Sequence, residues 1–276
     1  MHLGSLVGAL VSYLDARHHG GQWLLRVEDI DPPREVPGAA ADIVAALATH
    51  GLHHDGDCRY QSTSRALHDA AIDALLESGH AYFCQCSRRQ LRAAGHGSRY
   101  PGICRDRALS EGAVRVRVPN QAIVIHDRWQ PETRFDLDAE PGDFIVRRGD
   151  GLIAYQLAVV VDDADQGVTD VVRGVDLFDS TPRQIWLQQL LGLPQPRYAH
   201  FPVLLGNDGR KLSKQTGAPE LSADTPVENL TRALQAMGMP VPVQPQGHSP
   251  ESLVVWALEH YEPNTLRGRQ SFANKA

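Results

Sequence analysis

Apolar residues recur along the first third of the chain with the spacings of helices and of one strand. Leucines stand three or four residues apart from position 3 to position 14, which predicts a helix over residues 3–17 with one apolar face. Residues 22–29 form a nearly continuous apolar run, typical of a buried parallel strand. Helices follow over residues 39–50 and, after a Ser-Thr-Ser N-cap at 62–64, up to residue 77. The order helix, strand, helix, helix suits a doubly wound α/β domain.

The pattern changes at residue 81 and changes back at residue 144. Residues 113–118 alternate between apolar and basic side chains, which predicts a half-exposed strand, and residues 123–125 are another strand candidate. We therefore interpret residues 81–143 as an insertion into the α/β domain. The apolar α/β pattern resumes over residues 144–148 and 153–161.

The last third predicts two further strands and three helices. The strands cover residues 168–172 and 200–205, and a helix over 181–191 has a proline in its first turn. Two more helices are predicted over residues 226–237 and 250–261, the second capped by Ser249. The basic segment 267–276 carries no pattern, and we expect it to be frayed.

These elements predict three regions. Residues 1–80 and 144–222 form the two halves of the α/β domain, residues 81–143 form the insertion, and residues 223–276 form a short helical C-terminal region.

Composition and charge are those of an ordinary globular protein. Of the 276 residues, 42% are hydrophobic and 22% are charged, and the net charge is −6. This charge argues against broad electrostatic binding of nucleic acid, although a local basic patch remains compatible with a specific RNA contact. The sequence lacks both an apolar run of about 20 residues and a signal-peptide pattern, so we expect a cytoplasmic protein without membrane contact. We separately expect a monomer.

Three of the four cysteines are clustered and indicate a metal site. Cys84, Cys86 and Cys104 have spacings that favour a structural, tetrahedral zinc. The fourth ligand is either Tyr100 or His96, and imidazole is the far commoner ligand, so chemistry alone favours His96. Cys58 is isolated and is interpreted as a buried or half-buried thiol.

Two short motifs have the chemistry of a nucleotide site. His2-Leu-Gly4-Ser lies at a helix entrance, where free N–H groups favour phosphate and glycine lets a base or ribose approach the backbone. Lys211-Leu-Ser213-Lys214 offers two cations that can follow charge developing on a pyrophosphate. Each motif alone is a weak signal, because short matches are common by chance.

Together, in this order and about 200 residues apart, the two motifs resemble the signature pair of class I aminoacyl-tRNA synthetases. Residues 25–31, 155–163, 172–177 and 180–184 resemble the glutamyl branch of that family. The resemblance implies a Rossmann-like, doubly wound parallel sheet with a zinc-binding insertion and a short helical C-terminal region.

The resemblance also implies roles for individual residues. His2, Lys211, Ser213 and Lys214 would be catalytic, with His2, Gly4 and Lys214 binding ATP and Mg²⁺ accompanying it. Glu28, at the carboxyl end of the first strand, would bind the ammonium group of L-glutamate. Tyr155 and Arg173 would hold carboxylate or carbonyl oxygens. The family zinc site includes a tyrosine, which reverses the choice and makes Tyr100 the fourth ligand beside Cys84, Cys86 and Cys104.

The C-terminal part narrows the resemblance. Residues 30–35 and Gln215 resemble members of the family that lack an anticodon-binding domain, and only about 60 residues follow Gln215. The implied reaction forms glutamyl-adenylate from ATP and L-glutamate, then transfers the glutamyl group to the queuosine base in the anticodon loop of tRNA(Asp). Two alternatives stay open, namely a glutamyl-tRNA synthetase-like fragment that charges a 3′ end and a non-catalytic, zinc-stabilised RNA-binding paralogue.

The start of the chain departs from the family pattern. Members of the family have a strand and a Pro-Ser-Pro-Thr-Gly-like turn before the histidine, whereas this sequence begins at Met1-His2. We therefore expect that the first strand is missing, that the true start lies upstream, and that the chain as given has weak or no activity and poor solubility.

Overall fold

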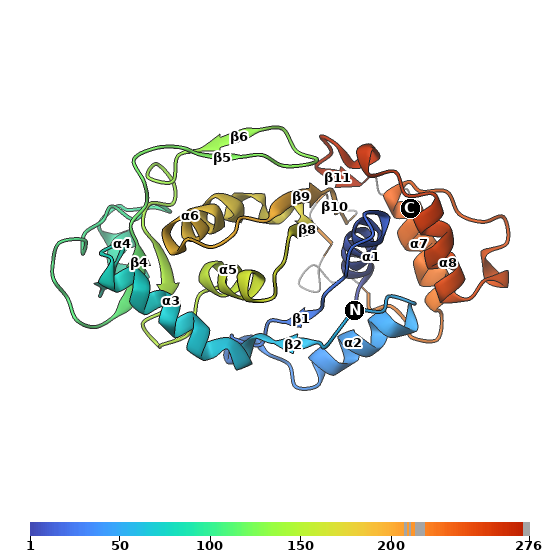
Figure 1. Ribbon diagram of the computed structural model, residues 1–276, viewed down its shortest axis with the longest axis horizontal. Helices are drawn as coiled ribbons and strands as arrows, with labels where there is room; N and C mark the ends of the chain where they lie inside the picture. The colour runs from blue at the N-terminus through green and yellow to red at the C-terminus, as the bar shows by residue number, and fades with distance from the viewer. Residues whose placement is uncertain (207–208, 210, 213–218, 273–276) are drawn as a thin grey trace.

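The computed structural model describes residues 1–206, 209, 211–212 and 219–272. The α-helices are α1 (Leu3–His18), α2 (Ala39–Thr49), α3 (Arg65–Glu77), α4 (Arg88–Ala93), α5 (Tyr155–Asp165), α6 (Thr181–Leu191), α7 (Pro226–Met237) and α8 (Pro250–Glu259). The strands are β1 (Arg26–Val27), β2 (Arg59–Tyr60), β3 (Ala81–Cys84), β4 (Ala113–Val116), β5 (Ile123–Ile125), β6 (Thr133–Phe135), β7 (Phe144–Arg147), β8 (Asp170–Gly174), β9 (Arg197–Phe201), β10 (Val203–Leu204) and β11 (Ser271–Phe272). Figure 1 shows an elongated molecule with α4 and β4 at one end, α5 and α6 in the middle, and α7 and α8 at the other end.

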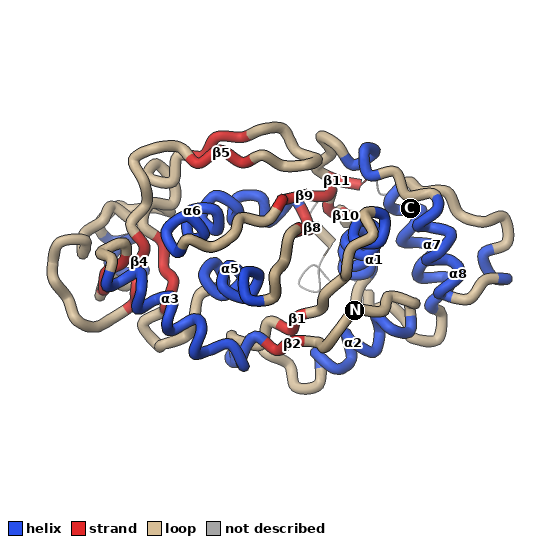
Figure 2. The backbone as a smooth tube through the Cα atoms, viewed as in Figure 1, coloured by secondary structure: helices blue, strands red, loops and turns tan. Residues whose placement is uncertain are grey.

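The strands form parallel pairs and antiparallel sheets. β7, predicted to belong to the α/β domain, instead pairs antiparallel with β4 of the insertion. β1 pairs with β2, β8 with β9, and β10 with β11, all in parallel. The antiparallel sheets have the orders β3-β4-β7 and β5-β6. Figure 2 shows these short strands distributed among the helices, with the β5 pair along one outer edge of the molecule. Among the described residues, the parallel strands form three separate pairs rather than one continuous sheet.

A cleft separates β1 from β8. Its volume is about 840 Å³, and residues from α1 and α5 complete its lining. Figure 1 shows β8 above β1, both between α5 and α1. The strand predicted over residues 22–29 is therefore wrong in extent. It shrinks to Arg26–Val27, because β1 has a strand neighbour, β2, on one side and the cleft on the other.

The predicted helices agree closely with the observed ones. α1 extends one residue beyond the prediction and buries Leu6, Leu10 and Leu14 completely. The predicted cap of α8 is confirmed, since the Ser249 hydroxyl accepts a hydrogen bond from the Ser252 N–H at 3.2 Å. Residues 155–165, for which the pattern left the element open, form α5.

The predicted cap of α3 is wrong. Residues 61–64 form a 3-10 turn, η2 (Gln61–Ser64), and Ser64 makes no capping hydrogen bond. Ser62 is instead bound to the carboxylate of Asp29, to which it donates from its N–H at 2.8 Å and its hydroxyl at 2.6 Å. Asp29 thus ties the end of the first strand to η2.

Two further predictions are corrected by burial. β4 is not half-exposed, because Arg115 is 8% exposed and donates to the Asp143 carbonyl oxygen at 2.6 Å. The segment after residue 267 is not frayed up to residue 272. Phe272 is 1% exposed in β11, and the Val203 N–H donates to the Gln270 carbonyl oxygen at 3.1 Å.

Two large apolar cores extend across the predicted regions. One joins α1 to α7 and α8, and the other joins β4 of the insertion to β7, α5 and α6. The division into three regions stays a prediction, but its boundaries at residues 80/81 and 222/223 do not separate these cores. No helix in the described part of the chain is long and apolar enough to cross a membrane.

Candidate active site

The first motif residue, His2, caps helix α1. Its Nδ1 accepts a hydrogen bond from the Ser5 N–H at 3.2 Å, and its Nε2 lies 2.9 Å from the Ser5 hydroxyl. Since Nδ1 accepts, the ring proton of the neutral histidine is on Nε2. The imidazole is therefore held at the positive end of the α1 dipole, where an anion is stabilised.

The second motif packs directly against the first. A methyl group on Gly4 would lie 3.2 Å from the carbonyl oxygen of Leu212, so a larger residue would have to displace a neighbour by a few tenths of an ångström. His2 also forms an antiparallel bridge with Glu220. Lys211 bridges Leu205, and its ammonium group lies 2.5 Å from the Asp176 carboxylate. The structure thus brings His2, Gly4 and Lys211 into one neighbourhood, whereas Ser213 and Lys214 lie outside the described residues.

The three residues proposed for the amino acid lie along the cleft between β1 and β8. Glu28 follows β1, Tyr155 begins α5, and Arg173 is in β8; all three line the cleft. Parallel strands present their carboxyl ends at one edge, and this is where α/β proteins bind ligands. Arg173 lies three residues before Asp176, whose carboxylate binds Lys211. The cleft therefore lies next to the second motif.

The cleft shifts the titration of its acidic groups. Glu28 keeps surface open to solvent, but the cleft walls desolvate its carboxylate and raise its pKa. Burial likewise raises the pKa of Tyr155 and that of Asp163. Arg26 opposes the shift at Asp163, to which it donates at 2.7 Å. The cleft therefore combines carboxylates with two guanidinium groups, as a zwitterionic ligand requires.

The sequence did not reveal which groups hold Arg173. Its Nε donates to His200 Nε2 at 3.0 Å, and its Nη2 donates to the Thr181 hydroxyl at 2.9 Å. His200 Nδ1 lies 2.6 Å from the Asp127 carboxylate. His200 is the parallel-register partner of Arg173 in β9, a signal that strand pairing could have supplied. Asp127 comes from the distant segment between β5 and β6 and left no such signal.

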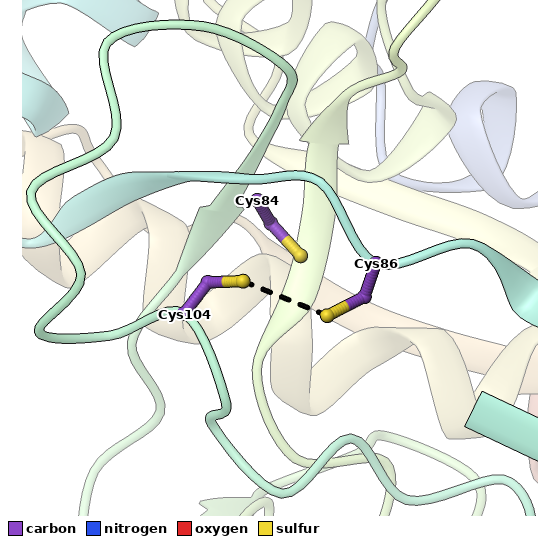
Figure 3. Close-up of side chains that lie close together, drawn as sticks. All are labelled: Cys84, Cys86 and Cys104. Carbon is purple, nitrogen blue, oxygen red and sulfur yellow. Dashed lines mark hydrogen bonds between the residues drawn. The ribbon is translucent and has the colours of Figure 1, made fainter. Parts of the chain in front are cut away.

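The candidate metal ligands converge in a small cluster of their own. The ligand atoms of Cys84, Cys86 and Cys104 all lie within 4.8 Å of one another, and Figure 3 shows the three sulfur atoms turned toward a common centre. The Cys86 and Cys104 sulfur atoms are 3.5 Å apart. His96 does not belong to this group among the described residues.

Tyr100 closes the cluster. Its hydroxyl oxygen lies 3.3 Å from the Cys84 sulfur and 3.8 Å from the Cys86 sulfur. In a tetrahedral zinc site with bonds of about 2.3 Å, neighbouring ligand atoms are about 3.8 Å apart. The three sulfurs and the phenol oxygen therefore fit such a site. Cys58 is half-buried and lies outside the cluster, as expected.

Hydrogen bonds tune the thiols of this cluster. Burial acts to raise the pKa of Cys104, but hydrogen bonds from Tyr100 and the Gln85 backbone lower it to about 7. The Tyr100 ring also stacks beneath the Arg115 guanidinium, 3.8 Å from its centroid. Arg115 in turn donates to the Cys84 sulfur at 3.3 Å, so that a cation faces the candidate ligands.

Comparison with known proteins defines the class. Residues 1–246 match the family described as tRNA synthetases class I (E and Q), catalytic domain. The chain belongs to this family, and it is a ligase of the aminoacyl-tRNA synthetase type. The resemblance and the class I α/β fold expected from the two motifs are confirmed.

The relatives are more specific. The chain is 52% identical over 264 residues to the Glutamyl-Q tRNA(Asp) synthetase of Ectopseudomonas mendocina, a match that covers 95% of this chain and 89% of that protein. It is 50% identical over 268 residues to the Glutamyl-Q tRNA(Asp) synthetase of Pseudomonas aeruginosa, covering 96% and 91%.

Solved structures agree on the fold. A glutamate tRNA ligase from Elizabethkingia meningosepticum superposes with a TM-score of 0.80 at 22% identity, covering 99% of this chain and 64% of that chain. The glutamate-tRNA synthetase of Elizabethkingia anophelis superposes with a TM-score of 0.81 at 22% identity, covering 100% and 66%. This chain therefore spans about two thirds of the length of those structures.

Proposed function

We propose that this chain activates L-glutamate with ATP and transfers the glutamyl group to the queuosine base in the anticodon loop of tRNA(Asp). The observation that carries the proposal is the identity of about 50% over about 95% of the chain with proteins named Glutamyl-Q tRNA(Asp) synthetase. The arrangement of the cleft and of the two motifs supports it. The reaction consumes ATP and a tRNA, and we place it in the cytoplasm, carried out by a monomer.

In the first step, the cleft binds glutamate and the motifs bind ATP. Glu28 binds the substrate ammonium group, and Tyr155 and Arg173 bind carboxylate oxygens. His2 and the free N–H groups of α1 face the phosphates of ATP, and the ribose or base approaches the backbone at Gly4. The α-carboxylate of glutamate attacks the α-phosphorus of ATP, and pyrophosphate leaves.

The lysines stabilise the departing pyrophosphate. Lys211 is held by Asp176 beside Leu212 and Gly4, close enough along the chain to act on the same phosphates. Ser213 and Lys214 complete the motif, and Mg²⁺ accompanies ATP as part of the substrate. In the second step, a hydroxyl of the queuosine cyclopentene-diol attacks the glutamyl carbonyl carbon, and AMP leaves.

Zinc would be structural in this mechanism. Cys84, Cys86, Tyr100 and Cys104 would hold it, and it would supply a cross-link between β3 and the segment around residue 104. The candidate ligands lie in the insertion and do not line the cleft that contains Glu28 and Arg173.

Two measurements test the proposal. Glutamate-dependent exchange between ATP and pyrophosphate tests activation. Transfer of radiolabelled glutamate to tRNA(Asp) with and without queuosine then tests the acceptor, with nuclease mapping of the labelled nucleotide. Label confined to the anticodon loop of the queuosine-containing tRNA is expected. Label at the 3′ end would favour a glutamyl-tRNA synthetase-like activity, and binding of tRNA without any exchange would favour a non-catalytic RNA-binding protein.

A further inference from the structure

Arg173 is fixed by the protein on one side and directed at the cleft on the other. Nε and Nη2 both donate to buried protein acceptors, at 3.0 Å and 2.9 Å. Among the described residues, the third guanidinium nitrogen, Nη1, makes no hydrogen bond. Because Arg173 lines the cleft, this nitrogen is the one left for an oxygen atom of a ligand.

The bond from Arg173 defines the protonation of His200. A nitrogen that accepts from a guanidinium N–H must carry a lone pair, so His200 Nε2 has no proton. The ring proton is then on Nδ1, which donates to the Asp127 carboxylate at 2.6 Å. The other tautomer, or a charged imidazolium, would place an N–H of the ring against the N–H of Arg173.

Asp127 is positioned to enforce this tautomer. One of its carboxylate oxygens, Oδ1, accepts from the backbone N–H groups of Trp129 at 2.9 Å, Gln130 at 2.9 Å and His200 at 3.2 Å. The other oxygen, Oδ2, is left for His200 Nδ1, and an ionised carboxylate can only accept. Both side chains are 0% exposed, so water does not compete for these bonds.

Charges on three elements act on the His200 ring. Asp127 faces it from the segment between β5 and β6, Arg173 from β8, and Asp176 from the turn η3 (Val175–Ser180) that follows β8. Burial and the Arg173 cation lower the pKa of His200, while Asp127 and Asp176 oppose them. The ring therefore stays neutral at neutral pH, which the hydrogen-bond geometry also requires.

We propose that Asp127 and His200 are positioning residues, which orient the Arg173 guanidinium toward the carboxylate of the substrate through a fixed histidine tautomer. This inference rests on the proposed function for the identity of that substrate. Thr181 completes the arrangement, because its hydroxyl accepts from Arg173 and lies 3.2 Å from His200 Nε2.

The decisive variant is Asp127→Asn, which preserves the shape of the side chain but replaces one acceptor oxygen with a donor NH₂ group. The asparagine carbonyl takes the place of the oxygen that binds three backbone N–H groups, so its NH₂ group faces His200 Nδ1. The ring proton then moves to Nε2 and opposes the N–H of Arg173. The ring nitrogen chemical shifts, measured by ¹⁵N NMR on labelled protein, should show an Nδ1 proton in the wild type and an Nε2 proton in the variant.

The kinetic readout separates positioning from general damage. In glutamate-dependent exchange, Asp127→Asn should raise the KM for glutamate by about tenfold or more, the loss expected for a misaligned carboxylate contact. The KM for ATP should stay within about twofold. In His200→Gln, the glutamine carbonyl oxygen can accept from Arg173 near the position of Nε2, and it has no tautomer to be fixed. The double variant with Asp127→Asn should therefore have a KM for glutamate no higher than that of His200→Gln alone. Asp143→Asn is the matched control, since it changes another fully buried carboxylate and should leave the glutamate KM unchanged.

Three outcomes have different meanings. An Nε2 proton on His200 in the wild type overturns the relay. An unchanged glutamate KM in Asp127→Asn, with the tautomer reversed, overturns its role in orienting Arg173 for the substrate. A wild-type chain that shows the Nδ1 proton but no glutamate-dependent exchange overturns glutamate as the proposed substrate. The claim that Asp127 and His200 orient Arg173 toward glutamate is then overturned as well.

Discussion

Replacing Gly4 by alanine tests whether the two motifs form one site. The added methyl group would lie 3.2 Å from the Leu212 carbonyl oxygen and equally close to two atoms of the His2 ring. These distances are shorter than comfortable van der Waals contacts, so a neighbour must move by a few tenths of an ångström. Gly8→Ala is the matched control in the same helix, where the nearest atom, Cζ of Phe201, is 3.4 Å away.

The two substitutions should have different effects on the free energy of unfolding and on the KM for ATP. In a helix, alanine is more favourable than glycine by about 1 kcal/mol, so Gly8→Ala should stabilise the protein by roughly that amount. At Gly4 the same gain is offset, because the His2 ring can move away only by weakening its cap of α1, and a cap is worth about 1 kcal/mol. The net change in the free energy of unfolding should therefore be close to zero. Displacement of His2 or Leu212 by a few tenths of an ångström should raise the KM for ATP several-fold.

Thermal unfolding and glutamate-dependent exchange measure both effects on the same preparations. Gly8→Ala should raise Tm by about 2 °C with an unchanged KM for ATP, whereas Gly4→Ala should leave Tm nearly constant and weaken ATP. If Gly4→Ala instead stabilises the protein as much as Gly8→Ala does and leaves the KM for ATP unchanged, the two motifs do not pack as described.

Three further predictions follow from the metal cluster and from the shifted carboxylates. Cys104→Ser should lose bound zinc, measured by elemental mass spectrometry, while Cys58→Ser should keep it. Burial raises the pKa of Glu28, so the KM for glutamate should begin to rise on acidification at a pH above the usual carboxyl value of about 4.3. Glu28→Gln should abolish this rise in KM. A rise that survives in the variant would refute the role of Glu28. Burial acts to raise the pKa of Asp162, but hydrogen bonds, chiefly from His68, lower it overall. The contribution of Asp162 to stability is complete above about pH 3.9 and is lost as the pH falls through its lower pKa in the folded state. The free energy of unfolding in urea should therefore decrease with falling pH, and this decrease should be smaller in Asp162→Asn.

Helices were predictable from the sequence because each carries its own periodicity and its own end signals. The leucine spacing defined α1, and the proline in its first turn marked the start of α6. Strand lengths were less predictable, since a strand exists only as far as its partner extends. The run at residues 22–29 is apolar at residues 23–25 and 27, yet only Arg26 and Val27 pair with a neighbouring strand.

Some residues of the candidate site were also predictable from local sequence patterns, and others were not. Residues that stand in contiguous motifs, such as His2, Gly4 and Lys211, could be named from the sequence together with their proximity. Asp127 could not, because its contact with His200 joins residues 73 positions apart and no local pattern specifies that pair. Arg115 was misplaced for a similar reason, since an arginine in an alternating strand looks exposed until its buried partners are known.

At the cysteine cluster, chemical frequency and geometry favour different residues as the fourth ligand. Imidazole is the more common zinc ligand, which favoured His96, and no spacing rule distinguishes it from Tyr100. The structure places the Tyr100 hydroxyl next to the cysteine sulfurs because the tyrosine backbone is held by Pro141 and the neighbouring Gly142. Those residues lie about 40 positions away, beyond the reach of a local pattern.

The pairing of β10 with β11 has a consequence for the order in which this protein is made. Leu204 is the register partner of Phe272 and also accepts a hydrogen bond from the Leu212 N–H at 2.8 Å. The strand that supports Leu212 therefore gains its parallel neighbour only after residue 272 has been synthesised, about 60 residues and several seconds later on a ribosome. Until then that edge of β10 is unpaired, and the nascent chain depends on late residues to complete the surroundings of the Lys211 motif.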